Sequence, residues 1–125
     1  MNSAELDRIA LFVVEHSTYT NMADIRVKIE KHFLYYTALA EYNTVGEVIA
    51  FCRWNIIDEK TAQILDLIIR LDYRNMGLIR QMAAKGLRLW NTVDEFIYER
   101  GYDDGKQVKP MKRYKAIKFT RRVMT

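Results

Sequence analysis

The sequence predicts one α+β domain with a mixed, mostly antiparallel sheet and helices on both of its faces. Three observations lead to this fold class. Residues 3–33 contain two stretches with apolar residues at helical spacing. Three apolar stretches, the first of them rich in aromatic residues, follow in residues 35–71 with short turns between them and predict an antiparallel meander. A third helical stretch, about residues 77–90, then separates the meander from two further strands and allows parallel pairing across it.

Length and composition limit the protein to one globular domain, residues 1–125. Half of its 125 residues are hydrophobic and 29% are charged, which is an ordinary globular composition. Cys52 is the only cysteine, so no intrachain disulfide can form, and His16 and His32 follow no zinc spacing. No apolar run approaches the roughly 18–20 residues of a membrane span, and no secretory signal pattern begins the chain. We therefore expect a cytoplasmic protein without a structural metal.

Asparagine residues begin both N-terminal helices in the prediction. Asn2 can cap a helix over residues 3–16, with Glu5 three positions later completing a capping-box pattern. Asn21 can cap a second helix, and Asp24 in its first turn suits the helix dipole. The sequence therefore predicts two capped amphipathic helices before the sheet.

The predicted meander has strands at residues 35–42, 47–57 and 61–71. Polar residues at 43–46 and 58–60 supply the two turns. The third strand alternates, which predicts that one side of it carries Thr61, Gln63, Leu65, Leu67, Ile69 and Leu71.

The last third of the chain is predicted to hold one helix and two strands. The helix covers about residues 77–90, and a short strand follows at 95–99. Glycine and aspartate residues at 101–105 predict a loop, and Pro110 is placed in the loop before a basic strand at about 114–121.

The junction between the third strand and the third helix carries the most informative pattern. Around Gly77 a strand runs into a glycine-containing turn that opens a helix. The free N–H groups of a first helical turn, together with the helix dipole, bind phosphate. Gly77 lets the backbone approach a ligand closely, and Arg74 adds a positive charge. These residues predict a diphosphate site.

The run Tyr73-Arg74-Asn75-Met76-Gly77-Leu78-Ile79-Arg80-Gln81-Met82 resembles the acetyl-CoA signature of the GNAT superfamily of N-acyltransferases, (Q/R)-x-x-G-x-(G/A). Arg74 matches its first position and Gly77 its central glycine, whereas Ile79 stands where the family has Gly or Ala. The element order from residue 3 to about 100 also resembles that family, without its first strand and its last helix. Small phage-type members of the superfamily would suit so short a chain.

The resemblance implies a cofactor, acetyl-CoA, and places it on particular residues. In the family the signature loop binds the CoA pyrophosphate through backbone amides, and the preceding strand pairs with the pantetheine arm. By this resemblance Ile68, Ile69 and Leu71 line the pantetheine, and the pyrophosphate loop comprises Arg74, Asn75, Met76, Gly77, Leu78 and Ile79.

The same resemblance implies direct acetyl transfer to an amine, for which the chain offers weak candidates. Asp66 and Glu47 are candidate bases, with solvent-facing strand carboxylates as the alternative. Tyr98 and Tyr102 are candidate acids to the leaving thiolate, with ordinary packing as the alternative. The adjacent Tyr35-Tyr36 are candidates for the acceptor side, unless one packs and the other is exposed. The acceptor amine itself cannot be predicted from this sequence.

Charge is unevenly distributed along the chain and supports rival functions. Residues 1–105 contain 12 Lys and Arg and all 16 Asp and Glu, a net charge of −4, whereas residues 106–125 carry +8. A basic end suits a nucleic acid or another polyanion, and the alternative is a solvated strand that resists edge pairing. A catalytically inactive scaffold that dimerises through a sheet edge is a further alternative. The basic residues are Lys106, Lys109, Lys112, Arg113, Lys115, Lys118, Arg121 and Arg122.

Overall fold

The computed structural model describes residues 1–74, 77–90, 92–102 and 105–112 of the chain. As far as the fourth strand its elements follow the predicted order of two helices, three strands, a helix and a strand, with one short 3₁₀ helix added before the third helix. They are α1 (Ser3–His16), α2 (Met22–Leu34), β1 (Ala38–Tyr42), β2 (Val48–Asp58), β3 (Thr61–Ile69), the 3₁₀ helix η1 (Leu71–Tyr73), α3 (Leu78–Leu89), β4 (Glu95–Tyr102) and β5 (Gly105–Lys112).

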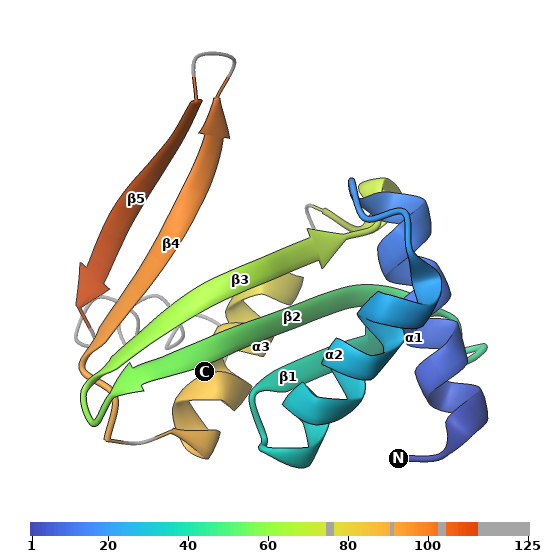
Figure 1. Cartoon of the computed structure of the whole chain (residues 1–125), viewed down its shortest axis with the longest axis horizontal. Coiled ribbons are helices and arrows are strands. Elements are labelled where there is room, and N and C mark those ends of the chain that lie inside the picture. The colour runs from blue at the N-terminus through green and yellow to red at the C-terminus, as the bar shows by residue number, and fades with distance from the viewer. Residues whose placement is uncertain (75–76, 91, 103–104, 113–125) are drawn as a thin grey trace.

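One five-stranded sheet, in the order β1-β2-β3-β4-β5, forms the centre of the fold. α1 and α2 lie on one face of it and α3 lies on the other (Figure 1). The pairs β1–β2, β2–β3 and β4–β5 are antiparallel, and β3–β4 is parallel. The first two pairs follow the predicted meander and the parallel pair follows the predicted crossover. The predicted fold class is therefore confirmed.

Both predicted helix caps are present. Asn2 Oδ1 accepts a 2.8 Å hydrogen bond from the backbone N–H of Glu5, and Asn21 Oδ1 accepts one of 3.0 Å from that of Asp24. Each bond satisfies an N–H group that has no partner within its helix. Between these helices and the sheet lies the first core cluster, comprising Leu6, Ile9, Ala10, Phe12, Val13, Ile25, Ile29, Ala38, Val48 and Phe51.

The first strand begins at Ala38, three residues later than predicted. The preceding residues belong instead to the end of α2. Tyr35 is its C-cap, Tyr36 has a left-handed backbone with φ 59°, and the Thr37 N–H donates a 2.8 Å hydrogen bond to the carbonyl of His32. The carbonyls of the last helical turn need such donors, so they hold these residues out of the sheet.

The predicted alternation of β3 is wrong beyond its middle, because the strand contains a bulge. Arg53 of β2 pairs with Asp66, but the next residue, Trp54, pairs with Ile64. Leu65 is therefore an extra residue in β3, and a single extra residue moves every later side chain to the opposite face.

The end of β3 also differs from the prediction. The strand ends at Ile69, and Leu71 begins the 3₁₀ helix η1. Ile64 before the bulge and Ile69 after it both pack in the core on the α3 face, which a strict alternation does not allow. The prediction that Leu71 continues the strand is thus wrong, and its side chain is 74% exposed.

β4 and β5 form a hairpin where the sequence predicted one short strand and a loop. β4 pairs with β5 in antiparallel register from Glu95↔Lys112 to Tyr102↔Gly105. Gly101 and Pro110 consequently lie in strands, and Pro110 is tolerated because β5 is the edge strand of the sheet. The basic strand predicted at residues 114–121 lies outside the described residues.

A second core cluster fills the space between the sheet and α3. It shares β2 with the first cluster, because every residue from Val48 to Trp54 is buried. Its buried members are Ile49, Ala50, Cys52, Trp54, Ala62, Ile69, Leu78, Met82 and Val93.

Neither a transmembrane helix nor a metal-binding cluster is found in the described part of the chain. None of its helices has the length and apolar character that crossing a membrane requires. Nor do its His, Cys, Asp and Glu residues form a group of three or more that suits a metal ion.

Candidate functional site

A left-handed glycine opens α3, at the position the sequence singled out. Gly77 is the N-cap, with φ 76° and no side chain to cap the helix. A Cβ atom built on Gly77 meets no atom of the described residues within 4 Å. Among these residues the first-turn N–H groups of α3 also lack the side-chain acceptor that α1 and α2 both have. Of the predicted loop, Asn75 and Met76 lie outside the described residues.

The surroundings of this helix end favour an anion. The first turn of α3 contains no acidic residue. Arg74 is exposed, and its Nε donates a 3.3 Å hydrogen bond to the carbonyl of Ile69, which holds the side chain against the end of β3. Leu78 is buried under the sheet, whereas Ile79 is 43% exposed and points away from the core. Positive charge and a helix N-terminus together attract phosphate.

A second arginine fixes the turn between β3 and α3. Arg70 makes two hydrogen bonds to the carboxylate of Asp72, of 3.0 and 3.1 Å, and its Nη1 lies 3.7 Å from Glu47. Its backbone N–H donates a 2.9 Å hydrogen bond to the carbonyl of Ile49, and its guanidinium lies over the ring of Tyr73. The candidate base Glu47 is therefore placed beside this turn, with its side chain 59% exposed.

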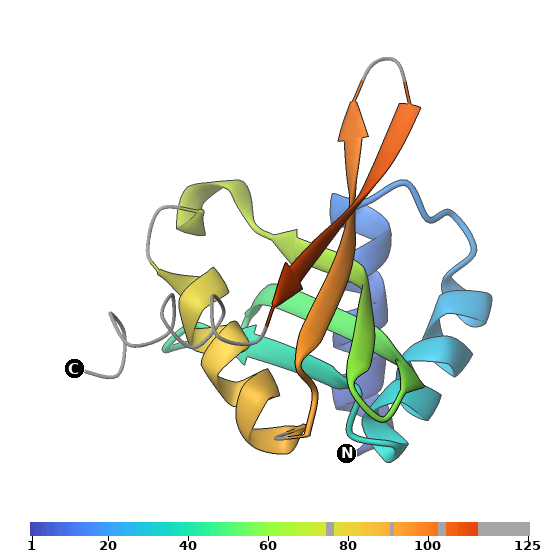
Figure 2. The same ribbon diagram turned by 90° about the vertical axis from the view of Figure 1, so that its left-hand side faces the viewer.

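β3 and β4 are paired at their N-terminal ends and move apart toward their C-terminal ends. They pair in parallel only from Thr61↔Glu95 to Ile64↔Tyr98, after which β4 continues with β5 alone (Figure 2). The later part of β3 therefore has an edge that faces no described strand. Leu67 on this part is 42% exposed although β3 is the middle strand of the sheet. Such an edge offers backbone N–H and C=O groups to an extended ligand.

The predicted pantetheine residues lie on or next to this free edge. Ile68 packs partly against the core on the α1 and α2 face, and Ile69 is buried on the α3 face. Leu71 lies beyond the strand, in η1, and is exposed. Because both isoleucine side chains pack against the core, the groups available at this edge are those of the backbone.

The bulge lies where the two strands begin to separate. Leu65 follows Ile64, which is the last residue of β3 that pairs with β4. It also has no partner in the register with β2. A bulge residue of this kind has backbone groups that no ladder uses.

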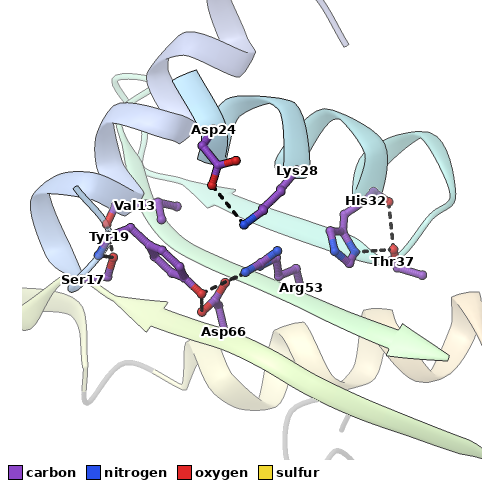
Figure 3. A network of polar contacts seen from close by, with 9 residues as sticks. All are labelled: Val13, Ser17, Tyr19, Asp24, Lys28, His32, Thr37, Arg53 and Asp66. Carbon is purple, nitrogen blue, oxygen red and sulfur yellow. Dashed lines mark hydrogen bonds and ion pairs between the residues drawn. The ribbon is translucent and has the colours of Figure 1, made fainter. Parts of the chain in front are cut away.

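Next to the bulge lies a buried ion pair. Arg53 and Asp66 are joined through Nε and Oδ2, and their side chains are 9% and 10% exposed. Tyr19, from the segment between α1 and α2, donates a 3.0 Å hydrogen bond to Asp66 and accepts one of 2.9 Å from Arg53 (Figure 3). Burial lowers the pKa of Arg53, but the hydrogen bond and charge of Asp66 outweigh it and raise that pKa. The candidate base Asp66 is therefore buried, paired with Arg53 and hydrogen-bonded to Tyr19.

The tyrosine candidates fall into two places. Tyr98 lies in β4 opposite Ile64, at the point of separation, and Tyr102 lies at the far end of the same strand. Tyr35 and Tyr36 are both exposed, so neither packs in the core as the alternative required.

Sequence reasoning missed Arg53 and Tyr19. Arg53 is the only charged residue in the apolar run of β2, and an arginine there signals a buried partner. Tyr19 carried no signal, because only the folded chain brings it to Asp66, 47 positions away.

The sequence matches the model of the acetyltransferase (GNAT) family over residues 4–95. No curated protein matches it significantly. Solved structures share its fold at low identity. One is a GNAT family N-acetyltransferase from Escherichia coli in complex with CoA, with a TM-score of 0.57 and 14% identity, over 88% of this chain and 78% of that one.

Two further structures show the same likeness. A phosphinothricin acetyltransferase from Sinorhizobium meliloti in complex with AcCoA has a TM-score of 0.63 and 11% identity, over 98% of this chain and 70% of that one. A Pyrococcus horikoshii protein assigned as an acetyltransferase has a TM-score of 0.64 and 11% identity, over 94% of this chain. The chain spans 40% of the length of that last protein.

Proposed function

The chain belongs to the acetyltransferase (GNAT) family, and on that basis we propose that it binds acetyl-CoA along β3 and transfers the acetyl group to an amine. One observation carries the proposal. The strand β3, with its free edge, is the last strand before α3, whose N-terminus has no side-chain cap among the described residues, so a site for an extended ligand precedes a site for an anion along the chain.

The residues at the α3 end suit a diphosphate. Its oxygens would accept hydrogen bonds from the first-turn N–H groups that follow Gly77. Gly77 has the positive φ that glycine adopts readily, and Arg74, three residues before it, would add positive charge. Ile79, at the position where the family has Gly or Ala, is exposed and leaves its own amide accessible.

The free edge of β3 suits the pantetheine arm. Amide groups of that arm would pair with the backbone between Leu65 and Ile69, where β4 no longer does. The thioester would then lie beside the bulge. The unused N–H of a bulge residue can then polarise the thioester carbonyl, as an oxyanion donor does.

Transfer itself needs one bond made and one broken. The amine nitrogen attacks the thioester carbon, the C–S bond breaks, the amine gives up a proton and the CoA thiolate receives one. Of the candidate bases we favour Asp66, because it adjoins the bulge, whereas Glu47 lies beside Arg70 at the diphosphate end. Tyr98 is our candidate acid, because its position in β4 faces Ile64 at the point of separation.

Thermal stability in the presence of acetyl-CoA tests the binding part of this proposal. At 100 times its Kd the ligand should add about 2.7 kcal/mol to the free energy of unfolding. Gly77→Val should abolish this stabilisation. Gly46→Val is the matched control, because Gly46 also has a positive φ, 85°, but lies in the β1–β2 turn. If acetyl-CoA stabilises Gly77→Val as much as Gly46→Val, the proposed diphosphate site is wrong. If it stabilises neither the parent protein nor Gly46→Val, the binding proposal as a whole is wrong.

The roles of the carboxylates are tested separately. Asp66→Asn should lower kcat strongly while leaving the Kd for acetyl-CoA unchanged, and Glu47→Gln should leave kcat near that of the parent. Because Asp66→Asn breaks a buried ion pair, Tyr19→Phe supplies a milder variant that disturbs the same carboxylate. A larger loss for Glu47→Gln than for Asp66→Asn would overturn the assignment.

No specific observation favours the rival functions. Lys106, Lys109 and Lys112 lie on the edge strand β5, and the other five basic residues of the chain end lie outside the described residues. The comparisons add nothing for nucleic-acid binding or for a dimer. Acetyl transfer is thus the function that the site supports best.

A further inference from the structure

A cavity of about 490 Å³ lies between the C-terminal half of α2 and the part of β2 that extends past β1. Leu65, the bulge residue, lines it, so the cavity reaches the place where β3 and β4 separate. Trp90, the C-cap of α3, closes another side. On the proposed function, the acetyl group would meet this cavity at Leu65.

Cations line this cavity, and its lining contains no Asp or Glu within the part of the chain that the structure describes. Lys28, Lys31 and Arg53 come from α2 and β2. The acids that pair with two of them, Asp24 and Asp66, are not part of the lining. Figure 3 shows Lys28 turned toward Asp24, and Arg53 toward Asp66 and Tyr19.

The third cation, Lys31, forms no ion pair among the residues that the structure describes. His32 beside it is kept neutral, because burial and then the charge of Arg53 lower its pKa. After burial, the charges of Arg53 and, more weakly, Lys31 both lower the pKa of His32, whereas that of Asp66 raises it. One cation is therefore available to pair with an anionic ligand.

Aromatic side chains provide the rest of the wall. Tyr35, Trp54 and Trp90 all line the cavity. Aromatic rings beside cations suit a molecule with an apolar body and a negatively charged group. They do not suit a polyamine, whose several positive charges would be repelled by the lysines and Arg53.

We propose that this cavity binds the acceptor, and that the acceptor is a small amine that also carries a carboxylate or a phosphate. The inference rests on the proposed function, because it takes the thioester to lie at the bulge. The amine would lie toward Leu65 and the anionic group toward Lys31, with Lys28 and Arg53 contributing charge. The presence of an anionic group and an amine in the same molecule, rather than its size alone, would then select the substrate.

Matched pairs of acceptors test the proposal by release of CoA from acetyl-CoA. Phenylalanine and phenylethylamine differ only in a carboxylate, and O-phosphoethanolamine and ethanolamine differ only in a phosphate. We expect at least one anionic member to exceed its neutral partner in kcat/KM by about tenfold, the effect of one charge-assisted hydrogen bond. The pair that shows this preference distinguishes carboxylate from phosphate. Equal or greater activity with phenylethylamine, ethanolamine and spermidine would overturn the proposal.

Lys31→Gln locates the anionic group. It should lower kcat/KM for the preferred anionic acceptor by about tenfold, mainly through KM, and leave its neutral partner unaffected. Arg8→Gln, which removes one positive charge from the exposed surface of α1, is the matched control and should change neither. An equal loss in both variants, or no loss in Lys31→Gln, would contradict the assignment.

The two proposals can fail separately. If acetyl-CoA does not stabilise the protein, the proposed function is wrong. If acetyl-CoA does bind but the anionic amines are neither acetylated nor stabilise the CoA-bound protein, only the acceptor inference is wrong.

Discussion

The indole Nε1 of Trp90 donates a 2.8 Å hydrogen bond to the carbonyl of Tyr36, so the end of α3 is tied to the turn between α2 and β1. Tyr36 is the only residue other than glycine with a positive φ in the described part of the chain. A left-handed backbone costs a non-glycine residue about 1 kcal/mol. The hydrogen bond from Trp90 to the carbonyl of Tyr36 offsets this cost.

This relationship predicts opposite effects for two substitutions. Trp90→Phe removes the donor and should lower the free energy of unfolding by about 1 kcal/mol. Tyr36→Gly keeps the carbonyl and relieves the positive φ, so it should leave stability unchanged or raise it by up to about 1 kcal/mol. Urea unfolding measures both. Destabilisation by Tyr36→Gly would show that its exposed ring, not its carbonyl, matters at this turn.

The buried pair of Arg53 and Asp66 predicts strong coupling. Arg53→Met leaves the Asp66 carboxylate buried without its cation and should cost about 3–5 kcal/mol. Adding Asp66→Leu should recover most of that loss, because no charge is then left in the core. Urea midpoints of the parent and the single and double variants give the coupling. Additive losses in the double variant would mean that the two side chains do not act as a pair.

His32 predicts that stability falls in mild acid. Its pKa is lowered in the folded state, first by burial and then by Arg53, so the unfolded chain binds the proton more readily. Stability is therefore constant above the ordinary histidine pKa of about 6.5 and declines as pH drops below it. His32→Gln should flatten this part of the profile of unfolding free energy against pH. An NMR titration midpoint of His32 at or above 6.5 would contradict the prediction.

Cys52 predicts a thiol that is inert in the folded protein. It lies in the core on the α3 face, where burial and then the charge of Asp66 raise its pKa to about 12. The thiolate is the reactive form, so an aromatic disulfide reagent should not label Cys52 at neutral pH until urea unfolds the chain. Rapid labelling under native conditions would show that the strand opens locally.

The local parts of this fold could be predicted from the sequence. Asn2 and Asn21 begin helices because a cap needs only residues that follow within one turn. Gly77 begins α3 for an equally local reason, since only a strand, a glycine and a helical period are involved. The order of elements followed from these signals, and the parallel pairing of β3 and β4 followed from the helix between them.

Features that depend on distant partners could not be predicted in the same way. The bulge at Leu65 is defined by its register with β2, and nothing in the alternating apolar pattern of β3 announces an extra residue. The start of β1 depends on carbonyls at the end of α2. The cavity likewise combines α2, β2, the bulge and Trp90, so its positive lining exists only in the folded chain.

The run of buried residues in β2, from Val48 to Trp54, has a consequence for how the molecule comes apart. Phe51 packs under α1 and α2, while its neighbours Ala50 and Cys52 pack under α3. If either helical layer detached, it would expose to solvent one face of β2, the strand against which the other layer packs. We expect the described body of the protein to unfold as a single cooperative unit, with the amides of β2 the slowest to exchange with solvent.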